Sequence, residues 1–269
     1  MRLTALWAGL FCLLAATQAN AAETVKITDA RGTTTLNAQL FVPDGEGPFP
    51  ALVLLHGCAG IKDHHHRWAE RFADWGYVSL LIDSLGPREI EETCDNPMNL
   101  PPSVRQLDAL GGLKYLRTLA SVDGQRVALV GWSHGGWTAL KVISANGMWR
   151  YIDLPGGNFM GAATFYPWCV TSSYLVQPSL VMIGSDDDLT PARHCQELHR
   201  TLNDKSPPMK LVVYDGARHS FDNGLPMETR TNFFFPETTY RIGHHEASFV
   251  AAQTELQAWL AELLKPMIQ

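Results

Sequence analysis

The stretch Gly131-Trp132-Ser133-His134-Gly135 most strongly constrains how this chain of 269 residues folds. An apolar run at residues 126–130 precedes it, and a helix-like run at residues 137–143 follows it. A serine between two glycines, placed between a strand and a helix, is typical of a sharp turn that exposes the serine hydroxyl. Glycine suits both flanking positions, since a Cβ atom there would crowd the strand or the helix. An ordinary strand-to-helix connection also fits, so the interpretation needs partners elsewhere in the chain.

Runs of strand length alternate with runs of helix length along the chain. The strand-like runs are mostly continuous, as in buried parallel strands, at residues 36–42, 51–55, 78–82, 127–130, 162–166, 180–183 and 211–214. The helix-like runs cover residues 66–75, 104–119, 136–145, 192–202 and 246–264. This alternation predicts an α/β fold, a mostly parallel twisted sheet with helices on both faces. Neither a linker nor a repeat divides residues 22–269, so we expect one domain.

Three irregular stretches, at residues 83–102, 146–159 and 222–244, follow strands or interrupt the alternation. Loops after the carboxyl ends of parallel strands form the ligand crevice of such sheets, so these stretches are expected to shape a pocket. The run Phe233-Phe234-Phe235 is too apolar for a solvated loop. It either lines that pocket or tucks under the sheet.

Residues 1–21 are predicted to be a cleaved signal peptide. Arg2 provides the charged start, an apolar stretch follows, and Ala19-Asn20-Ala21 forms a cleavage site. The stretch is too short to span a membrane comfortably, and Cys12 lacks the preceding small residues of a lipid-anchored cysteine. The sequence has no Asn-X-Ser/Thr glycosylation site, which favours a bacterial periplasm. We expect a periplasmic or secreted protein without a membrane anchor.

Charge and motif content narrow the expected partners. The formal net charge is −6, and loss of Arg2 makes it more negative, which argues against nucleic acid as a partner. No phosphate-binding loop or dinucleotide fingerprint occurs, so no cofactor is expected. His64-His65-His66 and His244-His245 predict no metal site, because neighbouring side chains on a helix diverge and no further ligand stands at suitable spacing. No feature indicates an oligomeric state.

An activated serine needs a base and a carboxylate that orients the base, and in this fold they follow in the order serine, acid, histidine. Asp186-Asp187-Asp188 comes after the strand at residues 180–183, and His219 comes after the strand at residues 211–214. Both positions lie at carboxyl ends of strands, where Ser133 also lies. The spacing therefore predicts a catalytic triad, and the chemistry leaves open which of the three aspartates faces His219.

Such a triad also needs an oxyanion hole, made by the amide after the nucleophile and a second amide from an earlier strand-to-helix loop. His134 follows Ser133, and residues 56–60 follow the strand at residues 51–55. The backbone N–H groups of Cys58 and His134 are the predicted donors.

These segments resemble the dienelactone hydrolase family of α/β-hydrolases, in its exported branch with a serine nucleophile. The resemblance covers His56-Gly57-Cys58 and residues 83–88, 131–136, 184–191 and 216–221. The family pattern GxxDxxxP selects Asp187 as the triad acid. The resemblance implies an α/β-hydrolase fold and hydrolysis of small-molecule carboxylic esters through an acyl-serine.

The chain departs from the best-studied members, which use a cysteine nucleophile and a nearby glutamate. Ser133 replaces that cysteine, and Gly57 stands where the glutamate falls, so dienelactone itself is disfavoured as the substrate. The family holds a substrate carboxylate with arginines; Arg88 lies in a comparable loop and either does the same or forms a structural ion pair. Trp168 follows a strand end and either packs or walls the acyl pocket.

Four cysteines remain after signal cleavage, which allows three pairings in an oxidising compartment. Fold order favours Cys58 with Cys94, which follow consecutive strands, and Cys169 with Cys195, which flank the strand that delivers the acid. These bridges would hold in place the oxyanion loop, residues 56–60, and the acid loop, residues 184–191. Free buried thiols are the alternative.

The same triad also serves peptidases and acyltransferases. A binding protein that kept the fold but lost turnover is an alternative from a different class. The intact serine, acid, histidine and oxyanion loop favour an enzyme.

Overall fold

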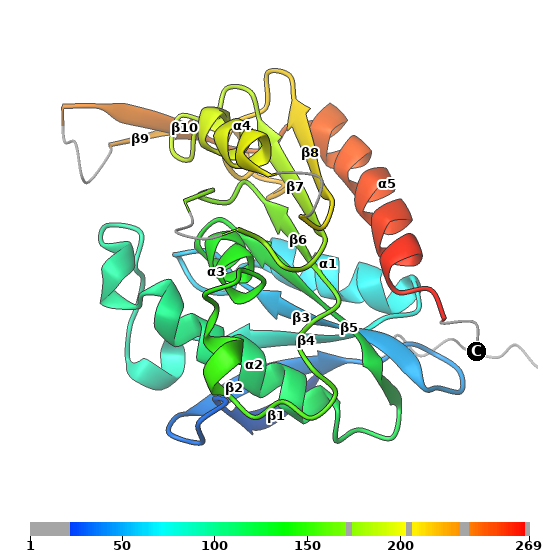
Figure 1. Cartoon of the computed structure of the whole chain (residues 1–269). Coiled ribbons are helices and arrows are strands. Elements are labelled where there is room, and N and C mark those ends of the chain that lie inside the picture. Colours follow the sequence, from blue (N-terminus) through cyan, green and yellow to red (C-terminus); the bar gives the residue numbers. More distant parts are fainter. Residues whose placement is uncertain (1–21, 171–173, 203–205, 232–236, 267–269) are drawn as a thin grey trace, which may run out of the picture.

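The computed structural model describes residues 22–170, 174–202, 206–231 and 237–266 (Figure 1). The predicted signal peptide at residues 1–21 and the run Phe233-Phe234-Phe235 lie outside the described residues. Among the residues that are described, no helix is both long and apolar enough to cross a membrane.

A twisted sheet of eight strands forms the centre of the molecule, in the order β1-β2-β4-β3-β5-β6-β7-β8. The strands are β1 (Glu23–Thr28), β2 (Thr35–Phe41), β3 (Phe49–Leu55), β4 (Val78–Asp83), β5 (Val122–Trp132), β6 (Ala162–Phe165), β7 (Ser179–Gly184) and β8 (Met209–Tyr214). β2 pairs antiparallel with both β1 and β4, and every pairing from β4 to β8 is parallel. Strands β4, β3, β6 and β7 are almost completely buried, which explains their continuous apolar runs.

Helices cover both faces of this sheet (Figure 1). They are α1 (Asp63–Asp74), α2 (Pro102–Leu116), α3 (His134–Val142), α4 (Ala192–Thr201) and α5 (Glu246–Leu263), with short 3-10 turns at η1 (Gly86–Arg88), η2 (Pro97–Asn99) and η3 (Met148–Tyr151). α2 and α3 pack together on one face. α1 and α5 meet on the other, where the Trp68 and Phe249 rings lie 5.9 Å apart. The predicted α/β fold is confirmed.

Several elements differ from the sequence prediction, and three regions show the physical reasons. β1 was not predicted, because an edge strand with mostly exposed side chains has no continuous apolar run. Helix α1 begins at Asp63 rather than at residue 66, since the backbone N–H of Lys62 donates to His65 Nδ1 (2.9 Å) and closes the first turn. The predicted irregular stretch at residues 222–244 contains a hairpin of β9 (Glu228–Thr231) and β10 (Thr239–Ile242), which projects from the body in Figure 1.

Candidate active site

The turn between β5 and α3 holds Ser133 in a strained conformation, with φ 52° and ψ −114°. The flanking glycines are sterically required. A Cβ on Gly131 would lie 2.4 Å from the carbonyl oxygen of Gly135, and a Cβ on Gly135 would lie 2.0 Å from the carbonyl oxygen of Leu55. No side chain fits at either position without displacing the backbone, so the turn has the sharp strand-to-helix geometry that the motif predicts.

The structure brings the three predicted triad residues together from three separate loops. His219 Nε2 lies 3.0 Å from Ser133 Oγ, and His219 Nδ1 lies 2.9 Å from Asp187 Oδ2. His219 and Asp187 are both buried, and 4% and 3% of these residues are exposed. This chain of contacts has the geometry of a serine activated by a histidine whose orientation a carboxylate fixes.

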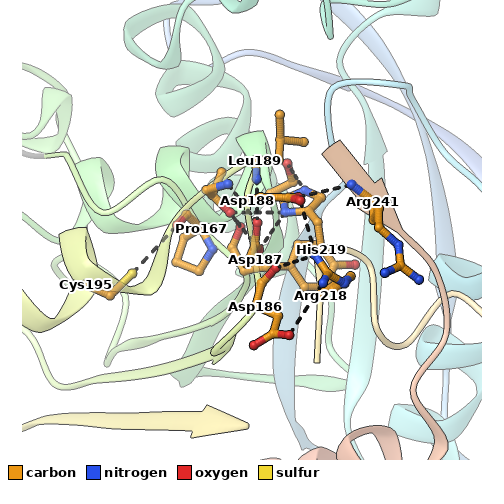
Figure 2. A network of polar contacts seen from close by, with 12 residues as sticks. Pro167, Asp186, Asp187, Asp188, Leu189, Cys195, Arg218, His219 and Arg241 are labelled. Atoms are coloured by element: carbon orange, nitrogen blue, oxygen red, sulfur yellow. Dashed lines mark hydrogen bonds and ion pairs between the residues drawn. The ribbon is translucent and has the colours of Figure 1, made fainter. Parts of the chain in front are cut away.

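Of the three consecutive aspartates, Asp187 faces His219 (Figure 2). Asp186 and Asp188 instead turn outward to the guanidinium of Arg218, and Asp188 Oδ1 also accepts from the backbone N–H of Arg241 (3.1 Å). The last contact ties hairpin strand β10 to the acid loop.

Asp187 is held by the backbone that follows it. Its Oδ1 accepts hydrogen bonds from the N–H groups of Leu189 (3.0 Å) and Thr190 (2.8 Å). Thr190 Oγ1 lies 3.0 Å from Asp187 Oδ2 and 3.1 Å from His219 Nδ1. Thr190 was not among the predicted site residues, although it lies within the GxxDxxxP segment.

A second buried carboxylate, Asp222, supports the other side of the histidine. It accepts hydrogen bonds from the indole N–H groups of Trp68 and Trp132, both at 2.8 Å, and from the Tyr166 hydroxyl at 2.6 Å. Burial and the charge of Asp222 raise the pKa of Tyr166 well above its usual value, so the phenol stays a donor. The Tyr166 ring packs 4.5 Å from the His219 ring. Sequence reasoning missed this network because no motif marks it.

The two predicted oxyanion donors sit on peptides whose orientation is fixed. A peptide N–H and the C=O of the same peptide point in opposite directions, so holding one directs the other. The Gly57 carbonyl, which shares a peptide with the Cys58 N–H, lies 2.6 Å from His56 Nδ1. The Ser133 carbonyl, paired with the His134 N–H, accepts from the Trp137 N–H (2.9 Å). In the part of the chain that the structure describes, neither donor amide makes a turn or cap hydrogen bond.

Two buried histidine rings beside these donors are neutral. His56 Nε2 accepts from the backbone N–H of Ser84 (3.1 Å), which places its proton on Nδ1. His134 Nδ1 accepts from Arg105 (2.8 Å), which places its proton on Nε2, facing the Pro97 carbonyl. Burial, then Arg105, lowers the pKa of His134 to about 3, and burial lowers that of His56 well below its usual value.

Both predicted disulfide pairings are present, Cys58 with Cys94 and Cys169 with Cys195. The first bridge fastens the oxyanion loop to the loop after β4. There the Thr93 N–H also donates to the Cys58 carbonyl (2.9 Å). The second joins the segment after β6 to α4, the helix that follows the acid loop.

A cavity of about 610 Å³ opens in front of Ser133 and His219. Cys58 lines it, whereas Asp187 and the buried His134 are not among the described residues that line it. Its walls come from the first turn of α1, the loop after His219 and the β9–β10 hairpin. Apolar contacts come from Trp132, Leu189, Leu225, Ile242 and Phe249. Among the described residues that line it are also His64, His65 and His244, yet no group of three His, Cys, Asp or Glu residues there could hold a metal ion.

Two predicted substrate contacts do not reach this cavity. Arg88 makes two bonds to the buried Asp108 carboxylate, at 2.7 and 3.0 Å, and a third to the Ser84 carbonyl. This is the structural ion pair that the sequence left as its alternative role. Trp168 packs on Trp137, with ring centroids 5.3 Å apart, and stays 39% exposed; neither it nor Arg88 is among the described residues that line the cavity.

Comparison with known proteins places this chain in a family. A model of the dienelactone hydrolase family matches residues 36–263. The chain belongs to the dienelactone hydrolase family. A Yersinia pestis relative named "Putative carboxymethylenebutenolidase" is 24% identical over 199 residues, which cover 70% of this chain and 74% of that protein. Membership of the dienelactone hydrolase family makes the protein a hydrolase of esters or similar substrates.

Solved structures share the fold at low identity. Dienelactone hydrolase from Anabaena variabilis has a TM-score of 0.66 at 17% identity, covering 92% of this chain and 100% of that chain. Esterase 2 of Thermogutta terrifontis has a TM-score of 0.65 at 16% identity, covering 93% and 98%. Both similarities support an α/β-hydrolase fold for this dienelactone hydrolase family member.

Proposed function

We propose that the protein is a carboxylesterase that works through an acyl intermediate on Ser133. The contact chain from Ser133 Oγ through His219 to Asp187, with the serine on a strained elbow in front of a cavity, carries this proposal. Thr190 Oγ1 also lies 3.1 Å from His219, on the Nδ1 side of the ring, but Thr190 is not among the described residues that line the cavity.

In the first half of the reaction, His219 Nε2 accepts the Ser133 proton while Oγ attacks the ester carbonyl carbon. The carbonyl oxygen becomes an oxyanion, which the amides of Cys58 and His134 stabilise. His219 then donates its proton to the leaving alcohol, and the acyl group remains on Ser133. Asp187 and Thr190 hold the ring by its Nδ1 side throughout.

In the second half, His219 takes a proton from water, which attacks the acyl carbon, and the released Ser133 oxygen recovers the proton. By precedent, each oxyanion donor contributes about 3 to 4 kcal/mol to the barrier reduction. The donors act best when they do not move during the reaction, and the fixed peptides of Cys58 and His134 satisfy that condition.

The site favours a substrate other than dienelactone. A Cβ on Gly57 would lie 3.6 Å from Ser133 Cβ, so a glutamate here would face the nucleophile, but glycine supplies no carboxylate. Arg88, bound to Asp108, is not free to hold a substrate carboxylate. We propose a small-molecule ester that fits the mostly apolar cavity.

We further propose that residues 1–21 direct export and that residues 22–269 work as one domain in the periplasm or outside the cell. The two disulfides support an oxidising compartment. Mass spectrometry of the protein from a periplasmic extract tests this: an N-terminus at residue 22 is expected, and an intact Met1 in the cytoplasm would contradict it.

Mass spectrometry after treatment with a fluorophosphonate probe tests the nucleophile. The mature protein should gain one adduct on Ser133, and folded Ser133→Ala should gain none and turn over no p-nitrophenyl ester. A series of short to long esters, matched amides and added alcohols separates esterase from peptidase and acyltransferase. A folded wild-type protein that takes no label would indicate a binding role instead.

A further inference from the structure

Arg105, in the first half of α2, is a buried cation behind the oxyanion hole. Only 1% of the residue is exposed. Its Nη2 donates to the His56 carbonyl (2.8 Å), and its Nη1 donates to His134 Nδ1 (2.8 Å). One guanidinium therefore joins the two loops that carry the proposed oxyanion donors.

The hydrogen-bond acceptors of Arg105 are neutral. Asp108 and Asp83 act on it only through space, and both Asp108 oxygens are already bound by Arg88. Among the described residues, no carboxylate forms an ion pair with Arg105, and its buried Nε has no partner. Burial lowers its pKa to about 10, so the guanidinium stays protonated near neutral pH. A buried charge without a bonded counter-charge is costly, which calls for a compensating role.

The developing oxyanion supplies such a counter-charge. It forms only during the reaction, at the amide of Cys58, two residues after the carbonyl that Arg105 binds, and at the amide of His134, whose ring Arg105 binds. The His56 carbonyl precedes Gly57, whose peptide carries the Cys58 N–H, and the His134 ring belongs to the second donor residue. A fixed positive potential at that place favours the transition state over the neutral substrate.

We propose that Arg105 is a positioning residue of the oxyanion hole, which locks the His56 and His134 segments together and adds positive potential that only the anionic intermediate uses. The inference rests on the proposed esterase function. It goes beyond it by assigning a role to a side chain that does not line the cavity.

The test compares Arg105→Met and Arg105→Lys with a matched control, Arg117→Met. The Arg117 guanidinium also binds backbone carbonyls, those of Gly124, Pro155, Gly156 and Gly157, but it lies beyond the end of α2, away from the site. Each variant is assayed for kcat and KM on a p-nitrophenyl ester and for inhibition by an alkyl boronic acid. The boronic acid forms an anionic tetrahedral adduct with an activated serine.

For Arg105→Met we expect kcat to fall about 10- to 100-fold, boronate affinity to fall by a similar factor, and KM to stay within about 2-fold. Arg105→Lys keeps the charge but not the two-pronged contact, so it should recover part of both losses. Arg117→Met should lower the melting temperature and leave kcat and boronate affinity unchanged.

A purely structural role predicts a different pattern, in which Arg105→Met resembles Arg117→Met and loses melting temperature alone. That result overturns the proposal. If Arg105→Met does not fold, Arg105→Lys decides: unchanged kcat and boronate affinity overturn the proposal, and a kcat loss of about 3-fold or more at constant KM supports it. Fluorophosphonate labelling of the wild type separates the two hypotheses. If the wild type takes no label, the esterase proposal is rejected. If it labels normally and the Arg105 variants keep their kcat and boronate affinity, only this inference is rejected.

Discussion

The two sides of the site stabilise charge in opposite ways. On the acid side, residues 184–190 and 217–219, the Asp187 carboxylate is surrounded by donors, including the Leu189 and Thr190 amides. On the oxyanion side, residues 56–58 and 133–134, the donor amides have no anionic partner among the described residues of the resting protein. They are backed by neutral rings and a buried guanidinium.

The difference reflects when each charge exists. In the proposed mechanism the Asp187 carboxylate holds His219 at every step, and the hydrogen bonds to this carboxylate are already made in the resting protein. In the proposed mechanism the oxyanion exists only in the intermediate, so its donors have no anionic partner in the resting protein, and rigid surroundings keep them in place. Removing a group from the acid side should therefore disturb the base at every step. Removing a group from the oxyanion side should mainly raise the energy barrier to formation of the anionic intermediate.

Asp187→Asn should produce the largest effect. The amide keeps the shape but presents a donor or a neutral acceptor to His219 Nδ1, which favours the wrong tautomer; kcat should fall about 10⁴-fold. Steady-state kinetics on a p-nitrophenyl ester measures it. Asp186→Asn is the matched control, because Asp186 faces Arg218 and solvent, and it should keep kcat within about 2-fold. Equal losses in both variants would contradict the assignment of Asp187.

The sequence predicted the acid side better than the surroundings of the oxyanion side. Ser133, Asp187 and His219 follow parallel strands, and the carboxyl ends of such strands meet at one edge, so the order of the loops was enough to predict that these residues meet. Arg105 lies in a helix whose residues are buried on nearly every side, and its partners come from two other loops. Only these tertiary contacts point to the role that we propose for Arg105. The β9–β10 hairpin was missed for a simpler reason: its short, exposed strands carry no apolar pattern.

Each side of the site has one disulfide, and removal of either disulfide should lower the free energy of unfolding by nearly the same amount. Their sequence separations, 36 and 26 residues, predict a loss of about 3 to 4 kcal/mol each when both cysteines become alanine. Cys58→Ala with Cys94→Ala should also lower kcat about 10-fold, because the Cys58 amide loses its tether. Cys169→Ala with Cys195→Ala should keep kcat within about 3-fold, because Asp187 is held by its own loop.

Urea unfolding and ester kinetics on both double variants measure these effects. An activity loss that is equal for the two bridges would show that the tether on the oxyanion side has no special role.

The neutral rings of the oxyanion side should make the protein sensitive to acid. The folded-state pKa of His134, about 3, lies below its ordinary value of 6.5. Below pH 6.5 the unfolded chain therefore binds a proton that the folded protein does not. Stability falls with decreasing pH, at a slope that approaches about 1.4 kcal/mol per pH unit, until the folded ring titrates near pH 3.

Urea titrations of wild type and His134→Gln at pH 7, 6 and 5 check this. The variant should lose less stability between pH 6 and 5, by up to about 1.4 kcal/mol, because it has no ring to protonate when unfolded. Identical pH slopes would show that His134 is not a buried neutral ring.

Arg218→Met should give the smallest effect. Arg218 binds groups on the acid side, and Arg105 binds groups on the oxyanion side, so the two arginines can be compared directly. The Arg218 partners Asp186 and Asp188 are 48% and 39% exposed, so water screens these ion pairs. We expect the free energy of unfolding to fall by less than about 1 kcal/mol, and by still less at high salt. The kcat should stay within about 2-fold of the wild-type value. Urea unfolding at low and high salt, with ester kinetics, measures both. A tenfold loss of kcat would mean that the outer aspartates hold Asp187 in place, and the two sides would then depend equally on a distant guanidinium.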